Sequence, residues 1–348
     1  MASVAWPILA GVAAVLIACG PLAPPQRRVP GADAFRGGAP RDGDRFANPG
    51  GPRPAAGMLI KLPFFLRRTW TTLAGRAGAA PVVPYDRAAL GQDPSVTWIG
   101  HSTMLVRMDG ATFLTDPMFS DRASPVPFLG PKRLVPPGVP IDDLPAIDFA
   151  TLSHDHYDHT DLPSIARLAE RGVVFVAGLG MGDLVRSVGG EVIELDWWQS
   201  VRLGDVTVHC VPAQHFSGRS IVGRRRRLWA GWVVVGRTRR FYHAGDTGYF
   251  DGFRIIRERL GPIDLAAIPI GAYRPSEMMR FVHLDPDEAV RAMIEVGART
   301  AIGMHWGTFD LADEPLDEPP RRFHAAANRA GVGADRVWTL AVGETRRW

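Results

Sequence analysis

Short apolar runs alternate with amphipathic stretches over most of the chain after residue 95. Runs such as Phe149–Leu152 and Val173–Ala177 are short and contain β-favouring residues, so they predict buried strands. Stretches such as Leu162–Arg171 and Asp285–Val296 repeat apolar residues every three or four positions, which predicts helices that bury one face. The second half of the chain repeats this alternation of predicted strands and helices, and polar residues lie at the ends of the predicted strands. The pattern therefore predicts an α/β fold with two sheets sandwiched between helices.

The same reasoning places the other elements. Ser95–Val106 and Ala111–Thr115 predict the strands of a hairpin that turns at Asp109–Gly110. A Pro-rich loop follows from Asp116 to Pro145, and loops of this length in compact domains are usually functional. A second hairpin is predicted over Val201–Val211. Further strands are predicted at Val192–Leu195, Leu228–Val235, Phe241–Tyr242, Leu265–Ile270, Ala301–Met304 and Val337–Val342, and further helices at Met181–Val188, Asp251–Leu260 and Pro319–Ala330.

The N-terminal region differs from the rest. Its apolar stretch Ala5–Ala18 is too short to span a bilayer comfortably but suits a signal peptide, and it ends at Cys19 in a pattern that resembles a bacterial lipobox. We therefore expect residues 1–19 to be a signal peptide with Cys19 lipidated, which would anchor the chain in a bacterial cell envelope, facing the periplasm. The first six residues lack Lys and Arg, so an uncleaved N-terminal anchor is the alternative.

Two further segments complete the predicted organisation. Residues 20–56 are dense in Pro, Gly and Arg, which predicts a tether, and residues 57–348 are expected to form one domain. Met58–Trp70 is apolar with a basic end and predicts a short amphipathic helix. Such a helix either lies on a membrane or packs against the domain, and packing is the commoner outcome.

Composition and charge limit the classes of binding partner that the protein is expected to have. Hydrophobic residues make up 46% of 348 residues, which is enough for a sizeable core. The net charge is +4, and nearly all of the positive charge is arginine. This excess fits an anionic membrane surface or substrate, and it fits equally an arginine-rich genome composition. No aromatic-basic pattern indicates nucleic-acid binding. Cys210 lies within a predicted strand, where we expect a small buried apolar group.

The segment F-A-T-L-S-H-D-H-Y-D-H-T-D at residues 149–161 carries the candidate chemistry. His154 and His156 follow a strand, where residues i and i+2 point to the same side and can face one ion. Asp158 and His159 lie further on and can reach a second ion. Imidazole and carboxylate groups at this density suit zinc or a similar divalent metal. The alternative, a set of exposed polar loop residues, fits poorly with five such groups directly after an apolar strand.

A two-metal site needs more ligands, and three candidates also follow predicted strands: His215, Asp246 and His305. Each has a simpler reading. His215 alone would more often be a surface or core histidine, and Asp246 in G-D-T-G could serve only as a turn residue. His305 could be a packed histidine, although it ends a strand where a ligand is missing.

The order HxHxDH, His, G-D-T-G, His is similar to that of the metallo-β-lactamase superfamily. Longer strings resemble the branch of N-acyl-phosphatidylethanolamine-hydrolysing phospholipase D, among them T-W-I-G-H-S-T (97–103), G-P-K-R (130–133), A-G-D-T-G-Y (244–249), H-L-D-P-D-E-A-V (283–290) and H-W-G-T-F (305–309). The resemblance runs from about Arg45 to Glu344. It implies an αββα sandwich of two mixed sheets flanked by helices.

The resemblance also implies a ligand set. One zinc would sit on His154, His156 and His215. A second would sit on Asp158, His159 and His305, and Asp246 would bridge the two ions. Asp158 is also the expected catalytic carboxylate. Iron or manganese in place of zinc is compatible with these ligands.

The expected activity is that of a dizinc phosphodiesterase. It would cleave N-acyl-phosphatidylethanolamine or a related phospholipid at a membrane surface, using an activated water that attacks phosphorus and releases phosphatidate and an N-acylethanolamine. A lactonase or a soluble phosphodiesterase of the same fold is the enzymatic alternative. A non-catalytic membrane lipoprotein is the alternative of another class, but all seven ligand positions are filled.

Residues around the substrate are less clearly indicated. His283 matches a histidine that the family places near the substrate pocket, and a polar role at a helix N-terminus is the other reading. Tyr273 and Arg274 follow a predicted strand and are expected to line the pocket. His101 reads either as a donor to a ligand or, slightly better, as a packed strand histidine. The sequence does not indicate which acyl chains the enzyme prefers. It also leaves the oligomeric state open, and a homodimer is one of the alternatives.

Overall fold

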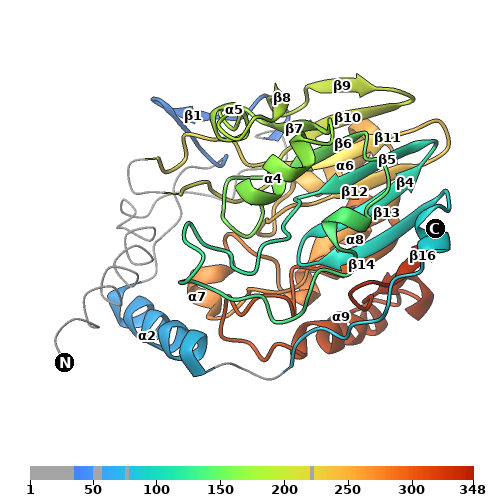
Figure 1. Ribbon diagram of the computed structural model, residues 1–348. Coiled ribbons are helices and arrows are strands. Elements are labelled where there is room, and N and C mark those ends of the chain that lie inside the picture. The colour runs from blue at the N-terminus through green and yellow to red at the C-terminus, as the bar shows by residue number, and fades with distance from the viewer. Residues whose placement is uncertain (1–34, 50–56, 75–77, 220–222) are drawn as a thin grey trace.

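The computed structural model describes residues 35–49, 57–74, 78–219 and 223–348. Most strands belong to two seven-stranded sheets (Figure 1). In each sheet three antiparallel pairings are followed by three parallel ones, so both sheets are mixed. The described part of the chain therefore confirms the predicted arrangement of two mixed sheets with helices outside them.

One sheet combines six strands from the first half of the domain with the last strand of the chain, in the order β16-β3-β4-β5-β6-β7-β8. Its strands are β16 (Thr345–Arg347), β3 (Ser95–Gly100), β4 (Thr103–Met108), β5 (Ala111–Thr115), β6 (Phe149–Leu152), β7 (Val174–Gly178) and β8 (Glu191–Leu195). Alternate residues on these strands face opposite sides. One side packs against α4 (Leu162–Ala169) and α5 (Gly182–Arg186), where Leu105, Leu114 and Ile165 belong to one apolar cluster.

The sheet of the second half has the order β15-β14-β13-β12-β11-β10-β9. Its strands are β15 (Val337–Trp338), β14 (Ala298–Met304), β13 (Ile263–Pro269), β12 (Arg240–His243), β11 (Gly231–Val235), β10 (Val206–Val211) and β9 (Ser200–Leu203). Helices α6 (Gly252–Leu260), α8 (Pro286–Val296) and α9 (Glu318–Arg329) cover its outer side. Shorter elements are β1 (Arg41–Asp42), β2 (Arg45–Phe46), α3 (Arg87–Leu90), α7 (Ser276–Met279), and the 3-10 turns η2 (Ile141–Asp143) and η3 (Ala334–Arg336).

The main core lies between the two sheets. Val106 and Phe113 from one sheet share a buried cluster with Val208 and Trp232 from the other. The Trp232 indole also donates a hydrogen bond of 3.1 Å to the carbonyl of Leu152, the last residue of β6. This bond joins the second sheet to the end of β6, where the histidine-rich turn begins. The packing of the core therefore also holds the start of that turn in place.

Two strand predictions were wrong. Ser95–Val106 is not one strand, because the chain reverses at Gly100–Ser102 and forms the antiparallel pair β3–β4. Gly100 and His101 both have positive φ, +127° and +53°, a conformation that ends a strand. The last strand is not Val337–Val342 either: β15 stops at Trp338, and the chain ends in β16, which pairs with β3.

The predicted tether is too long at its C-terminal end. Phe35 and Phe46 are each 1% exposed, and residues 35–49 pack on the domain with β1 and β2. Two aromatic residues in a Pro- and Gly-rich segment supply enough apolar surface to order it. Asn48 from this segment donates to the carbonyl of His215 at 2.7 Å. The predicted signal peptide and lipidated Cys19 lie outside the described residues.

The predicted amphipathic helix exists as α2 (Met58–Ala74), longer than expected and containing Pro63. In Figure 1 it lies at the rim of the molecule, well away from both sheets. Among the described residues, no helix combines the length and the apolar character needed to cross a membrane.

Candidate metal centre

The histidine-rich turn begins at the end of β6, a fully buried strand that pairs in parallel with β5 and β7. The backbone then folds into a compact turn, in which the amide of Thr160 donates to the carbonyl of His156 at 2.9 Å. The hydroxyl of Thr160 donates to the carbonyl of His154 at 2.7 Å. These bonds curl the segment before α4 begins, which turns the side chains of His154, Asp158 and His159 toward one region.

One group of side chains consists of His154, His156, His215 and Asp246, whose candidate ligand atoms all lie within 4.8 Å of one another. The Nε2 atoms of His154 and His215 lie 2.8 Å and 3.2 Å from the Nδ1 atom of His156. Both Nε2 atoms are 3.8 Å from the same oxygen of Asp246. Three imidazoles and a carboxylate from three separate strand ends thus converge on one point.

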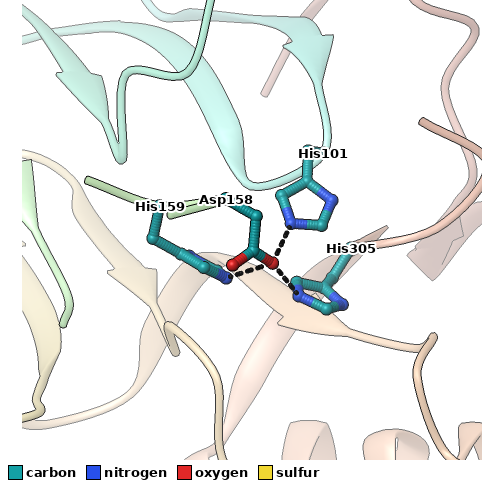
Figure 2. A group of neighbouring side chains, drawn as sticks. All are labelled: His101, Asp158, His159 and His305. Carbon is teal, nitrogen blue, oxygen red and sulfur yellow. Dashed lines mark hydrogen bonds and ion pairs between the residues drawn. The ribbon is translucent and has the colours of Figure 1, made fainter. Parts of the chain in front are cut away.

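A second group consists of Asp158, His159, His305 and His101, again within 4.8 Å of one another. Figure 2 shows the three rings directed at one oxygen of Asp158. That oxygen is 2.9 Å from Nε2 of His101 and 3.4 Å from Nε2 of both His159 and His305. Asp246 links the two groups, because it also lies 3.2 Å from His159 and 3.2 Å from His305.

The residues present fit a pair of divalent cations. Among the described residues, the buried atoms His159 Nε2, His305 Nε2 and Asp246 Oδ1 have no hydrogen-bond partner. Buried polar atoms normally have partners, so three unmatched polar atoms that lie close together call for a ligand. Imidazole nitrogens with carboxylate oxygens are the donor set that zinc takes and that other transition metals also accept.

The opposite nitrogen of three rings is fixed by a second partner. Nδ1 of His159 lies 2.7 Å from Asp116, Nδ1 of His215 lies 2.8 Å from a backbone carbonyl at Val282, and Nδ1 of His154 lies 2.9 Å from the hydroxyl of Ser153. A partner on Nδ1 fixes the ring orientation and directs Nε2 at the centre. The structure therefore contains both a candidate ligand layer and the contacts that orient it.

Burial and neighbouring charges set the protonation states. Burial lowers the pKa of His154 and His215 well below its ordinary value, which keeps these imidazoles neutral and able to bind a cation. Burial opposes ionisation of Asp158, but His159 and a hydrogen bond from His101 hold the pKa of this carboxyl well below its usual range. Burial alone would lower the pKa of His305, but the nearby carboxylates of Asp246 and Asp158 raise it to about 9. A proton and a divalent cation therefore compete for that ring.

Backbone strain concentrates around the site. His101, Asp116 and His305 all have positive φ, at +53°, +36° and +63°. Non-glycine residues in this region each cost on the order of 1–3 kcal/mol and occur preferentially at functional sites. Gly245, at +59°, precedes Asp246, and a Cβ there would lie 2.7 Å from the Cβ of Ser153. Only glycine lets the Asp246 loop approach the histidine-rich turn this closely.

The structure brings together all seven residues predicted as ligands, which are His154, His156, Asp158, His159, His215, Asp246 and His305. His283 lies beside them, with Nδ1 3.8 Å from Asp246. Tyr273 and Arg274 belong to neither group. The hydroxyl of Tyr273 donates to Glu318 at 2.7 Å, and the guanidinium of Arg274 donates to the same carboxylate at 2.9 Å.

Sequence reasoning undervalued His101 and overlooked Asp116. His101 is not a packed strand histidine, because it occupies the β3–β4 turn and contacts Asp158, 57 residues away. A glycine before the histidine was the available signal for a turn. Asp116 was read only as the start of a loop, yet it is fully buried and accepts bonds from Ser153 and His159. No local pattern distinguishes it from an ordinary turn residue.

Comparisons with known proteins agree with the fold. Residues 111–306, more than half of the chain, match the family described as a beta-lactamase superfamily domain. An uncharacterized protein of Mycobacterium tuberculosis is 43% identical over 271 residues, which cover 74% of this chain and 72% of that protein. The N-acyl-phosphatidylethanolamine-hydrolyzing phospholipase D 1 of Caenorhabditis elegans is 44% identical over 238 residues, covering 65% of this chain and 67% of that protein.

The fold is also similar to that of solved structures. Igni18, a metallo hydrolase from the archaeon Ignicoccus hospitalis, superposes with a TM-score of 0.56 at 22% identity, covering 73% of this chain and 97% of that one. Together the matched domain, the relatives and the shared architecture show that the chain belongs to the metallo-β-lactamase superfamily and is a metal-dependent hydrolase.

Proposed function

We propose that the protein is a phosphodiesterase of the phospholipase D type that cleaves N-acyl-phosphatidylethanolamine or a related phospholipid. The two groups of donor atoms that share Asp246 carry this proposal, because paired metal sites of this kind suit displacement at phosphorus. The name of the Caenorhabditis elegans relative supports the lipid substrate. Water would attack phosphorus, the bond to the ethanolamine oxygen would break, and phosphatidate and an N-acylethanolamine would leave.

The proposed cofactor is a pair of zinc ions, with iron or manganese as substitutes that the same donors accept. His154, His156 and His215 would hold one ion, and Asp158, His159 and His305 would hold the other, with Asp246 shared. Bound divalent ions supply Lewis-acid stabilisation of the phosphate charge and lower the pKa of a nearby water.

Asp158 is the proposed catalytic carboxylate. It is ionised and lies among the donor atoms of the second group, where it can orient the attacking water and accept its proton. His101 donates to its Oδ2 atom at 2.9 Å and holds the carboxylate in place. Burial lowers the pKa of His283 to about 4, which keeps this ring neutral at physiological pH. Its Nδ1 atom is buried without a hydrogen-bond partner among the described residues and groups with Asp246 and His305 as a third set of candidate donors. In the tautomer with the proton on Nδ1, it could donate to a substrate oxygen.

Substrate binding by His283, Tyr273 and Arg274 remains part of the proposal. The shared contact with Glu318 holds the last two side chains on the same side of the 271–275 segment. Anchorage through a lipidated Cys19 in a bacterial cell envelope is likewise proposed, supported by the apolar stretch that precedes Cys19 in the sequence. Incorporation of labelled palmitate into the wild-type chain but not into Cys19→Ser would support it. Equal labelling of both chains would contradict it.

Lipid hydrolysis by the metal-loaded protein tests the activity. The full chain is stripped of metal, reloaded with zinc, manganese or iron in separate samples, and incubated with N-acyl-phosphatidylethanolamine. Phosphatidate and N-acylethanolamine are then quantified together with bound metal. We expect equal amounts of the two products, and at least about 10²-fold less product from Asp158→Asn.

Asp142→Asn is the matched control, because Asp142 is an exposed carboxylate that pairs with Arg167 on the surface. This variant should keep wild-type activity. Absence of phosphatidate above the level of Asp158→Asn would refute the lipid substrate. Hydrolysis of lactones or of bis-nitrophenyl phosphate in its place would favour the lactonase or the soluble phosphodiesterase.

A further inference from the structure

Helix α2 exposes an apolar stripe to solvent. Leu59, Leu62, Leu66 and Trp70 recur every three or four residues and therefore share one face of the helix. Leu59 is 93% exposed and Trp70 is 70% exposed, and the two residues between them in the stripe are about half exposed. Contiguous exposed apolar surface of this kind marks interaction sites on soluble proteins.

The side of α2 that faces the protein is held in a different way. Phe64 and Phe65 are buried there, and Arg68 pairs with Asp310 and, at 3.3 Å, with Asp313. These contacts fix the rotation of the helix about its axis. An amphipathic helix normally turns its apolar stripe toward the domain, whereas here partly buried ion pairs and two phenylalanines attach the opposite side.

The position of α2 connects it with the metal centre. It packs against α7 (Ser276–Met279), a short helix that precedes His283 in the chain. The acidic residues that bind its arginines lie in the segment directly after His305. The two segments that contact α2 are therefore close in the chain to His283 and His305. A surface bound by α2 would lie on the same side of the molecule as these two segments.

Charge indicates what the stripe binds. Helix α2 contains Lys61, Arg67 and Arg68 and no acidic residue, and Arg67 stays half exposed although both arginines pair with Asp310 or Asp313. A helix that combines Leu and Trp on one face with basic flanking residues is typical of those that lie in the interface of an anionic bilayer. A second copy of the chain is the competing occupant of the stripe, and the test below distinguishes it from a bilayer.

We propose that α2 docks the protein on an anionic phospholipid bilayer, with Leu59, Leu62, Leu66 and Trp70 inserted at the level of the headgroups. The choice of a bilayer as the occupant rests in part on the proposed phospholipid substrate. Docking in this orientation holds the segments around the metal centre against the surface that contains the substrate.

Fluorescent labels on the full-length chain test this orientation. Cys19 and Cys210 are replaced by Ser and Ala, and an environment-sensitive nitrobenzoxadiazole label is attached through Leu62→Cys. Ile294→Cys on α8 is the matched control, because it is also an exposed aliphatic position on a helix. With vesicles of phosphatidylcholine and phosphatidylglycerol, we expect the label at 62 to shift to shorter wavelength and to be quenched by nitroxide lipids. The label at 294 should do neither.

A second variant measures the contribution of the stripe. Leu59→Ser and Leu62→Ser, followed through a label at Leu66→Cys, should raise the half-saturating lipid concentration by roughly tenfold or more, because two leucines no longer enter the bilayer. The labels need no turnover. Protein that docks but releases no phosphatidate would therefore contradict the proposed function and leave the docking proposal intact.

Two results would overturn the proposal. A label at 62 that behaves like the label at 294 on protein bound to vesicles would show that another part of the chain makes the contact. A concentration-dependent spectral shift without vesicles, together with a doubled molecular mass, would assign the stripe to a second copy.

Discussion

Asp116 determines which nitrogen of His159 is free to bind a metal, and replacing it by Asn should weaken metal binding with almost no change of volume. Asp116 accepts hydrogen bonds from the amide of Ser153 at 2.7 Å and from its hydroxyl at 2.6 Å, and it lies 2.7 Å from Nδ1 of His159. A carboxylate at this position requires a proton on Nδ1 and leaves Nε2 as the acceptor. Nε2 is the atom that faces Asp158 and Asp246.

The Asn side chain places an amide group where an oxygen was. When the amide nitrogen faces His159, it donates to Nδ1, and the proton of the ring moves to Nε2. That tautomer cannot bind a cation at the centre. Loss of such an orienting partner typically lowers metal affinity by about 10–100-fold, which we expect for Asp116→Asn. The metal-free variant should also lose roughly 1.5–3 kcal/mol of unfolding free energy, because a buried charge-assisted hydrogen bond disappears.

Metal affinity is measured by competition with a chromophoric chelator, and unfolding free energy by urea denaturation of the metal-free protein. Asp148→Asn is the matched control, since Asp148 accepts a backbone hydrogen bond of 2.7 Å from Thr112 at the opposite end of β6. The control should bind metal as the wild type does. Wild-type affinity in Asp116→Asn would refute the view that Asp116 sets the tautomer of His159.

Three further changes test other parts of the structure. Asp246→Ala removes the carboxylate shared by both donor groups, and we expect at most one bound metal per chain by elemental analysis; two retained ions would contradict its bridging role. His101→Ala removes the donor to Asp158 and should lower turnover by about 10–100-fold at unchanged metal content. His101→Gln, which keeps an N–H donor, should recover part of the loss, and equal loss in both variants would argue against this role. Burial alone would raise the pKa of Asp109, but hydrogen bonds from Thr238 and the following backbone amide lower it. The stabilisation is therefore present above the ordinary pKa of about 4 and is lost as the pH falls through the lower native value. Asp109→Asn should cost roughly 1–2 kcal/mol in urea unfolding at pH 7 and less in acid, and a cost independent of pH would contradict the assignment.

The sequence alone predicted the candidate ligands of the histidine-rich turn, because these residues are close together in the chain. His154, His156, Asp158 and His159 follow directly after a recognisable apolar strand, and the spacing fixes which side chains face one region. The outlying His215 also follows an apolar strand. The two strands lie in different sheets, β6 in one and β10 in the other, so the grouping of His215 with the turn came from the family resemblance and not from the geometry of a single sheet.

Tertiary structure decided whatever depends on contacts between distant segments. The role of His101 arises from a turn that breaks a continuous apolar pattern and from a carboxylate 57 residues away. The final strand pairs with β3 at the opposite end of the domain sequence, so its own three residues give no signal. Residues 35–49 look like a tether by composition, and only the packing of Phe35 and Phe46 into the main apolar cluster makes them part of the domain.

Helix α2 shows the same division most clearly. Its sequence determined that the segment is helical and that one stripe is apolar, because both follow from a period of 3.6 residues. The sequence did not determine which side faces the protein. Arg68 finds its partners at Asp310 and Asp313, more than 240 residues further along the chain. Periodicity shows which residues share one face of a helix. Which face packs against the domain depends on contacts with side chains from distant parts of the chain.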